Sequence, residues 1–315
     1  MFRIKESTKN HKNQFERWLN YEDSVGRKGI DIFKKNGITF VNGNEKADIG
    51  ISWHGFLVNN VPKDKCVLMK NEPPIYYAIF NRRMNNPNYN KKFLFTMSSH
   101  YLDGFDQHYY TIPRYEFNLI NKYFNKSRER KLCMILRNKN KSFLINEFSP
   151  RTKKYNEKSL IKFRQQIDEK LCNISNSHIY NSYGGPWEYP CYCGKIPGGG
   201  KWDVFSKYQF TLCPENSRFD GYVTEKPIQP MCCGSIPIYY GAPDVEKYVK
   251  KETFINFEEF QNIEELYNYI LYLSGEEYRR FIVKMKRFIT TGESNNFSSY
   301  TFACNFLKVL NEVKI

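Results

Sequence analysis

A glutamate and a lysine stand side by side where a polar loop meets the start of an expected helix. Glu225 and Lys226 follow a short apolar run, residues 208–213, which indicates a buried strand, and the polar loop 214–221. With the apolar run 235–240 after the helix, this is the order of a nucleotide-binding unit whose ligands bind beyond the strand ends. A cation and a carboxylate at a helix start can hold a diphosphate and a sugar hydroxyl. The spacing alone also fits a capped surface helix with a Glu–Lys pair.

A second carboxylate lies at the end of another expected strand. Glu72 follows the apolar run 65–69 and directly precedes Pro73 and Pro74. A carboxylate at the carboxyl end of a strand, in a turn stiffened by prolines, suits a catalytic base. It also fits an ordinary loop glutamate that caps a turn, so the residues alone leave both roles open.

The net charge of the chain limits the classes of partner. The 315 residues are enough for two domains, and 48 Lys and Arg against 33 Asp and Glu leave a charge of +15. This charge invites a nucleic-acid interpretation. However, the lysines are spread along the chain and form no single block. A nucleotide diphosphate, which needs only a local basic site, is an anionic partner that fits this spread better, and we expect no specific nucleic acid.

The cysteines and the acidic residues show no pattern typical of a metal site. Cys133 and Cys213 lie inside apolar runs, which predicts buried free thiols. Cys191-x-Cys193 and the adjacent pair 232–233 lack the CxxC spacing and the spaced histidines of a zinc site. The chain also lacks an Asp-x-Asp motif, which argues against a diphosphate held through a carboxylate-bound divalent cation. We expect no metal and no other cofactor.

The amino-terminal stretch carries no membrane signal. Residues 1–18 contain no apolar core of a signal peptide, and no window approaches the roughly 18 uninterrupted apolar residues of a membrane span. We expect a cytoplasmic or otherwise soluble protein, or an excised catalytic domain, without signal peptide or membrane anchor.

Apolar runs separated by polar turns predict an α/β protein of two domains. The charged stretch 121–130 indicates a linker, which gives an amino-terminal α/β domain at 1–125 and a carboxyl-terminal Rossmann-like domain at 126–315. The last expected helix, 302–313, is interpreted as one of the helices that close the second domain. The expected strands are 37–41, 47–52, 65–69, 93–97, 131–136, 179–185, 208–213, 235–240 and 253–257.

The segment that begins at residue 214 resembles a known family. PENS at 214–217, YVTEK at 222–226 and YYGAP at 239–243 are similar to the donor-binding signature of glycosyltransferase family 10, the α-1,3/α-1,4-fucosyltransferases that use GDP-fucose. The similarity continues through residues 246–273 and reaches back, more weakly, to about Cys66.

This resemblance implies a fold, a reaction and a set of site residues. The fold would be GT-B, two facing Rossmann-like domains with an interdomain active-site cleft. The reaction would be an inverting, metal-independent transfer of fucose from GDP-fucose to a hydroxyl of an acceptor glycan, with an α-1,3-type linkage. Glu72 would be the general base, and the leaving GDP would be stabilised by Lys226 and a second cation. The donor-binding residues implied are Asn216, Ser217, Tyr222, Glu225 and Lys226.

The chain departs from the family at one phosphate-binding position. Relatives place an arginine at the start of the helix expected at 159–171, where this chain has Leu160 or Ile161. Lys162 and Arg164 in the same helix, or Arg151 in the preceding loop, are the candidates to replace it. A lysine there would keep the charge and lose the bidentate geometry with phosphate.

The acceptor side carries a weaker pattern. Tyr76 and Tyr77, with Asp106 and His108 in the aromatic loop 103–110, would form a surface for an acceptor oligosaccharide. The same residues would equally fill a loop.

Two other functions stay open. The missing arginine, with Pro227 and Pro230 after the TEK residues, motivates a GT-B transferase that uses another GDP-hexose or a UDP-sugar. The second alternative is a non-catalytic binder of carbohydrate or nucleic acid on the same scaffold.

Overall fold

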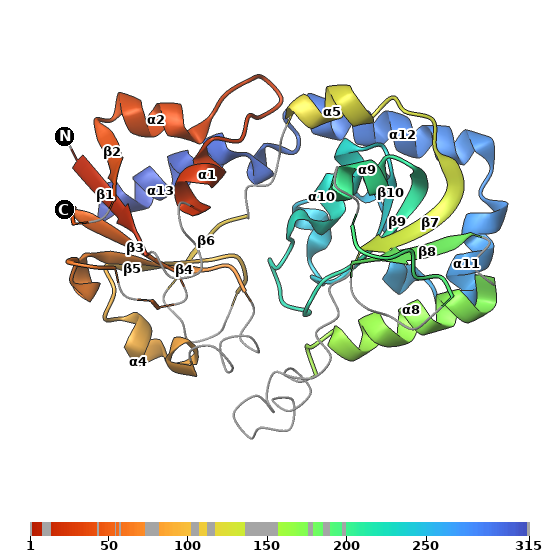
Figure 1. The fold of residues 1–315 in the computed structure, drawn as a ribbon, viewed down its shortest axis with the longest axis horizontal. Coiled ribbons are helices and arrows are strands. Elements are labelled where there is room, and N and C mark those ends of the chain that lie inside the picture. The colour runs from red at the N-terminus through yellow and green to blue at the C-terminus, as the bar shows by residue number, and fades with distance from the viewer. Residues whose placement is uncertain are drawn as a thin grey trace.

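The structure is a computed structural model in which the chain forms two α/β lobes side by side (Figure 1). Within the described part of the chain, no helix is both long enough and apolar enough to cross a bilayer. The described residues are 2–7, 14–42, 44–53, 55–56, 58–72, 82–101, 107–111, 117–135, 157–175, 179–184, 190–196 and 200–313.

The first lobe is built on a parallel sheet with the strand order β2-β1-β3-β4-β5-β6. Every residue of β3, β4 and β5 is buried, as expected for central strands covered on both faces. The strands are β1 (Phe2–Glu6), β2 (Ile38–Val41), β3 (Ile49–Trp53), β4 (Cys66–Lys70), β5 (Phe95–Ser98) and β6 (His108–Tyr109). Its helices are α1 (Gln14–Leu19), α2 (Gly29–Lys35), η1 (Lys63–Lys65), η2 (Arg82–Asn85) and α4 (Pro87–Asn90).

The second lobe is a parallel sheet with the order β11-β10-β9-β7-β8. Its strands are β7 (Glu129–Ile135), β8 (Tyr180–Tyr183), β9 (Tyr208–Pro214), β10 (Ile236–Tyr240) and β11 (Ile255–Asn256). Its helices are α5 (Phe117–Tyr123), α8 (Ile161–Ser175), α9 (Lys201–Phe205), α10 (Glu225–Cys232), α11 (Ile263–Tyr272), α12 (Gly275–Thr290) and the short η3 (Val245–Lys247), η4 (Lys251–Thr253), η5 (Phe257–Glu259) and η6 (Asn295–Phe297). Two parallel sheets with helices confirm the predicted α/β class.

The last helix, α13 (Ser299–Glu312), corrects the prediction that it closes the second lobe. It returns to the first lobe (Figure 1). There Phe302 and Phe306 lie in the core built on β1, β3 and β5. The ring of Phe15 lies 4.9 Å from that of Phe306, and Ser299 Oγ accepts a hydrogen bond from Gly29 N at 2.9 Å. An aromatic helix face can pack on either core, and its position in the sequence does not say which.

The charged stretch 121–130 is not a linker in the structure. It contains the end of α5 and the start of β7, and Phe124 is buried in the core of the second lobe. Arg128 Nε donates to Cys233 O at 2.9 Å, which ties the intervening turn to the end of α10. The boundary between residues 125 and 126 stays a prediction, and both α5 and α13 pack across it.

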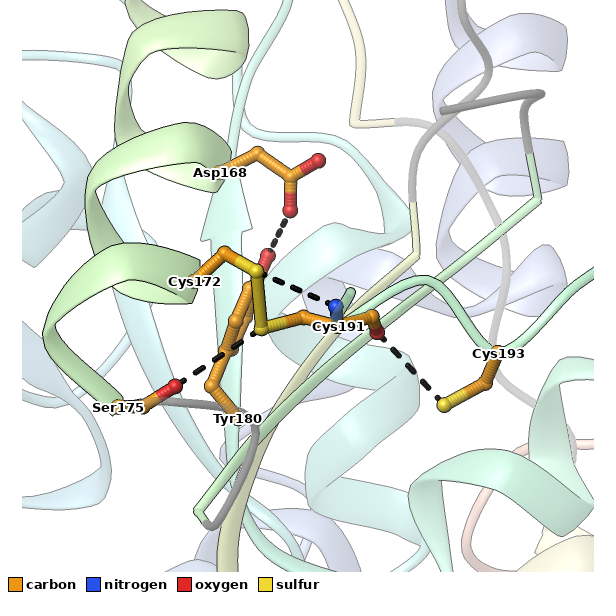
Figure 2. Close-up of a disulfide and its surroundings, with 6 residues drawn as sticks. All are labelled: Asp168, Cys172, Ser175, Tyr180, Cys191 and Cys193. Atoms are coloured by element: carbon orange, nitrogen blue, oxygen red, sulfur yellow. Dashed lines mark hydrogen bonds between the residues drawn. A yellow bond between two sulfur atoms is a disulfide. The ribbon is translucent and has the colours of Figure 1, made fainter. Parts of the chain in front are cut away.

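A disulfide joins α8 to the edge of the second sheet (Figure 2). The partners are Cys172 and Cys191, whose Cα atoms are 5.5 Å apart, and both are buried. The segment around Cys191 extends the sheet, because Ser182 N donates to Cys191 O at 2.8 Å and Cys193 N donates to Ser182 O at 2.9 Å. This disulfide was not predicted from the sequence. Cys133 and Cys213 are buried free thiols, as predicted.

We expect loss of this disulfide to destabilise the protein by about 3 kcal/mol, the effect of closing a loop of this size in the unfolded chain. The variant is Cys172→Ala, compared with Cys304→Ser, which removes an exposed free thiol. The measurement is urea unfolding with and without reductant. Equal stability of the wild type in both conditions, with both thiols open to alkylation in non-reducing buffer, would contradict the expectation.

Candidate active site

A pocket of about 470 Å³ opens at the carboxyl ends of the strands of the second sheet. Ile135 and Pro214, the last residues of β7 and β9, line it together with Gly184, which follows β8. Its opposite wall includes the first turn of α10. In a parallel α/β sheet this edge is where ligands bind, because the strand ends and helix starts leave a crevice there.

Four of the predicted donor-binding residues line this pocket together: Arg164, Asn216, Glu225 and Lys226. Arg164 lies one turn into α8, and its guanidinium donates a hydrogen bond to Asn216 Oδ1. The start of α8 is fixed to the same loop, because Leu160 N donates to Asn216 O at 3.0 Å. Polar groups from α8, the β9–α10 loop and α10 therefore converge on one crevice.

The three candidates for the missing arginine differ in position. Arg164 is nearly buried and faces the pocket. Lys162 is exposed and is not among the residues that line the pocket. Arg151 lies outside the described residues. Among the described candidates, Arg164 is the one that contacts the crevice.

Lys226 is held by the buried carboxylate of Glu215, a residue of the PENS motif to which no role was assigned from the sequence. Its Nζ donates to Glu215 Oε2 at 2.7 Å and to Thr224 Oγ1 at 3.0 Å. Glu215 is fully buried and also accepts hydrogen bonds from Thr224 N at 2.8 Å and Thr224 Oγ1 at 2.9 Å. A charged residue directly after a buried strand was the signal available in the sequence. Glu215 ties the two ends of the loop together and orients Lys226.

The charges around Lys226 keep it protonated. Burial by itself would lower its pKa, but the carboxylates of Glu215 and Glu225 outweigh burial and raise the pKa above the ordinary lysine value. Burial raises the pKa of Glu215, and the attraction of Lys226 opposes that rise. Arg164 is close enough to repel Lys226, so the pocket brings two cations together beside the carboxylates of Glu215 and Glu225, and cations of this kind form strong hydrogen bonds with phosphate oxygens.

Two other predicted donor residues lie behind the pocket wall. Ser217 and Tyr222 are each only 1% exposed, and neither lines the pocket. Residue 217 pairs with Ser159 in an isolated bridge, and the ring of Tyr222 meets that of His100 edge-on at 6.1 Å. Both side chains are therefore buried within the protein and are not exposed to the pocket.

The predicted base lies at the edge of the first sheet that meets the second lobe. Glu72 is half-buried and follows β4 by two residues. On the neighbouring strand, Tyr101 follows β5 by three residues, and its N–H donates to Asp220 O in the β9–α10 loop at 2.9 Å. The carboxyl ends of parallel strands share one edge, so Glu72 lies on the side of the first sheet that faces the β9–α10 loop.

Of the four predicted acceptor residues, the structure describes one, His108. Tyr76, Tyr77 and Asp106 lie outside the described residues. His108, on β6, packs its ring against Phe95 at 5.8 Å and lines a separate hollow of about 260 Å³ in the first lobe. It is not among the residues of the donor pocket.

Two buried basic residues near Glu72, Lys70 and His100, were not among the site residues predicted from the sequence. Lys70, the last residue of β4, is fully buried, and burial lowers its pKa to about 7. His100 is also fully buried, and burial together with the charge on Lys70 lowers its pKa to about 3. His100 is therefore neutral in the physiological range, and Lys70 changes charge within it.

We expect stability to rise between pH 7 and pH 9 because of Lys70. Across this window the unfolded chain keeps the lysine proton that the folded chain has released, so unfolding takes up a proton. The slope is at most about 1.4 kcal/mol per pH unit, and the destabilisation is complete below pH 7. Lys70→Met keeps the side-chain volume and should lose this slope. Parallel urea-unfolding profiles of the two proteins across the window would refute the assignment.

The fold that carries this pocket is that of the GT-B glycosyltransferases. A solved structure of an α1,3-fucosyltransferase with GDP superimposes with a TM-score of 0.60, covering 98% of this chain and 90% of that one at 19% identity. This likeness confirms the predicted fold.

The sequence places the chain more narrowly. The family profile Glycosyltransferase family 10 (fucosyltransferase) C-term matches residues 151–314, more than half of the chain. The chain therefore belongs to glycosyltransferase family 10, as its motifs predicted.

Curated relatives align over short stretches. The α-(1,3)-fucosyltransferase FucT of Helicobacter pylori is 44% identical over 71 residues, which are 22% of this chain and 15% of that protein. GDP-fucose protein O-fucosyltransferase 3 of Canis lupus familiaris is 34% identical over 79 residues, 25% of this chain and 16% of that protein. The aligned stretches thus span less than a fifth of either relative.

Proposed function

We propose that this protein is an inverting fucosyltransferase that transfers fucose from GDP-fucose to a hydroxyl of an acceptor glycan, with an α-1,3-type linkage. The observation that carries the proposal is the convergence of Lys226 and Arg164 on one pocket within the region that matches the family. The structural relative in complex with GDP supports the choice of nucleotide.

The proposed reaction is a single displacement. The acceptor oxygen forms a bond to the anomeric carbon of fucose from the face opposite the nucleotide, while the bond from that carbon to the β-phosphate oxygen breaks. Glu72 takes the proton of the acceptor hydroxyl, and the electron pair of the broken bond leaves with GDP. Because Glu72 comes from the first lobe and the donor pocket from the second, the two reactants would meet between the lobes.

The leaving diphosphate gains negative charge in this step. Lys226 and Arg164 would neutralise this charge. Glu215 orients the Lys226 side chain through its hydrogen bond and keeps it protonated. We propose Arg164 as the residue that replaces the arginine of the family, because its guanidinium offers the planar fork that phosphate oxygens accept. With these cations in place we propose that transfer needs no metal ion, so it should persist in a chelator.

The remaining donor residues divide into contacts and supports. Glu225 would accept hydrogen bonds from a hydroxyl of the fucose or the ribose, and Asn216, held by Arg164, would orient the donor. Ser217 and Tyr222 would act by holding the loop, since their side chains are buried behind it. For the acceptor oligosaccharide, Tyr76, Tyr77, Asp106 and His108 stay a prediction.

A panel of nucleotides and nucleotide sugars tests the proposal. At 100 times their own Kd, GDP and GDP-fucose should stabilise the protein by about 2.7 kcal/mol. UDP and UDP-sugars at the same concentrations should not. Among the nucleotide sugars of the panel, hydrolysis or sugar transfer should be detected with GDP-fucose alone. Protection by UDP would favour the alternative donor suggested by Pro227 and Pro230. A steeply salt-dependent affinity for DNA without GDP binding would favour a nucleic-acid binder.

A further inference from the structure

The loop that carries the donor residues is gripped at one glycine. Gly221, one residue before Tyr222, has φ +76°, a conformation that residues with a Cβ rarely adopt. A Cβ added there would lie 2.7 Å from Tyr109 Cε2 and 2.9 Å from ring carbons of Tyr101. Gly221 N donates to Asp244 Oδ1 at 2.8 Å. The backbone at this point is therefore packed directly against side chains of the other lobe.

Three tyrosines, Tyr101, Tyr109 and Tyr248, form what we call the Gly221 seat. Tyr109 Oη donates to Gly221 O at 2.8 Å. The ring of Tyr109 stacks on that of Tyr101, with centroids 4.7 Å apart and planes 14° apart, and its centroid lies 5.4 Å from that of Tyr248. Tyr101 and Tyr109 belong to the first lobe, whereas Tyr248 belongs to the second.

The Gly221 seat contacts the middle of the loop between β9 and α10, residues 215–224, which we call the donor loop. At one end are Glu215 and Asn216, and at the other is Thr224, which Glu215 holds through two hydrogen bonds. Between these ends, Tyr101 N donates to Asp220 O, and the ring of His100 contacts those of Phe219 at 5.8 Å and Tyr222 at 6.1 Å. Glu215, at one end of the loop, thus binds Lys226, whereas the middle of the loop is packed on the first lobe.

We propose that Tyr109, in the first lobe, is a positioning residue for the donor site in the second. By holding Gly221 it fixes the loop whose ends place Asn216 and Lys226 at the pocket. This inference rests on the proposed function, and it makes donor affinity a property of both lobes. Displacement of the first lobe would loosen the donor site even though the residues lining the pocket belong to the second lobe and its loop.

The test begins with Tyr109→Phe, which removes the hydrogen bond to Gly221 O and keeps the ring. Calorimetry should show a Kd for GDP about five-fold higher than in the wild type, the effect of one hydrogen bond. Tyr208→Phe is the matched control, because it removes a tyrosine hydroxyl that bonds Tyr183 and Asn181 within the second lobe. The two variants should unfold at similar temperatures, and the control should bind GDP as the wild type does.

A second variant separates positioning from folding. Gly221→Ala places a methyl group against Tyr109 in an unfavourable backbone conformation, so its Kd for GDP should rise more than ten-fold. In a double-mutant cycle with Tyr109→Phe, the two effects should be non-additive, because the two residues are in contact. Additive effects would overturn the assignment.

Hydrogen exchange distinguishes failure of this inference from failure of the proposed function. In Tyr109→Phe, amides of residues 219–224 should exchange faster than in the wild type and in Tyr208→Phe. Unchanged exchange together with an unchanged Kd for GDP would overturn the role of Tyr109. If the wild type binds no GDP, the proposed function falls, and faster exchange in this loop would still support Tyr109 as the residue that holds it.

Discussion

Replacing Glu72 by alanine is expected to abolish turnover while leaving GDP binding close to that of the wild type. A positioned general base contributes roughly 10²- to 10⁴-fold to a rate, and Glu72 is the predicted acceptor of the hydroxyl proton. The pocket that would hold GDP is lined by residues of the second lobe, whereas Glu72 follows β4 in the first. Steady-state transfer assays and GDP calorimetry on the same preparation would measure both quantities.

Two further variants make this result specific. Glu72→Gln keeps the shape and loses the basic oxygen, so it should be as inactive as the alanine variant. Glu169→Ala removes an exposed glutamate on α8 and should transfer at the wild-type rate. Turnover of Glu72→Ala within a few-fold of the wild type would remove Glu72 as the base.

Lys226→Ala should weaken both GDP binding and turnover. A preorganised group aimed at developing charge is worth roughly 2.7–4 kcal/mol of transition-state stabilisation, so we expect a loss of about 10²- to 10³-fold in kcat. GDP affinity should fall as well, because the diphosphate is charged before the bond breaks. This dual effect distinguishes Lys226 from Glu72, whose loss should affect turnover alone.

The alanine variant also leaves Glu215 buried without its cation, and breaking such a pair costs roughly 3–5 kcal/mol of stability. A Lys226→Met/Glu215→Gln double variant removes both charges and should recover the unfolding temperature without recovering GDP binding. Lys170→Ala, at an exposed position on α8, is the matched control for loss of a positive charge. Wild-type affinity for GDP in the folded double variant would refute the role of Lys226.

The sequence predicted the elements whose residues are mainly apolar. β4, β9 and β10 lie where such runs were found, because strands buried on both faces of a parallel sheet are mostly apolar. β1 was missed because Arg3, Lys5 and Glu6 interrupt its apolar residues. α13 was located correctly and assigned to the wrong core, because periodicity identifies an apolar face and does not identify its partner.

The same division applies to the candidate site. The resemblance led to Asn216, Glu225 and Lys226, which line one pocket. Glu215 directly follows a buried strand, but its contact with Lys226, 11 residues further on, depends on how the intervening loop folds back. The role of Tyr109 depends on a glycine 112 residues away, and no local pattern reports such a contact. The motif also predicted donor contact for Tyr222, which stays a prediction, since its side chain is buried and does not line the pocket.

A crystal structure after soaking with GDP tests the central claim most directly. We expect the diphosphate between Lys226 and Arg164 at the carboxyl ends of β7 and β9, with the Glu72 carboxylate directed toward the bound nucleotide from the first lobe. GDP bound elsewhere, or a Glu72 carboxylate directed away from it, would contradict the proposed function.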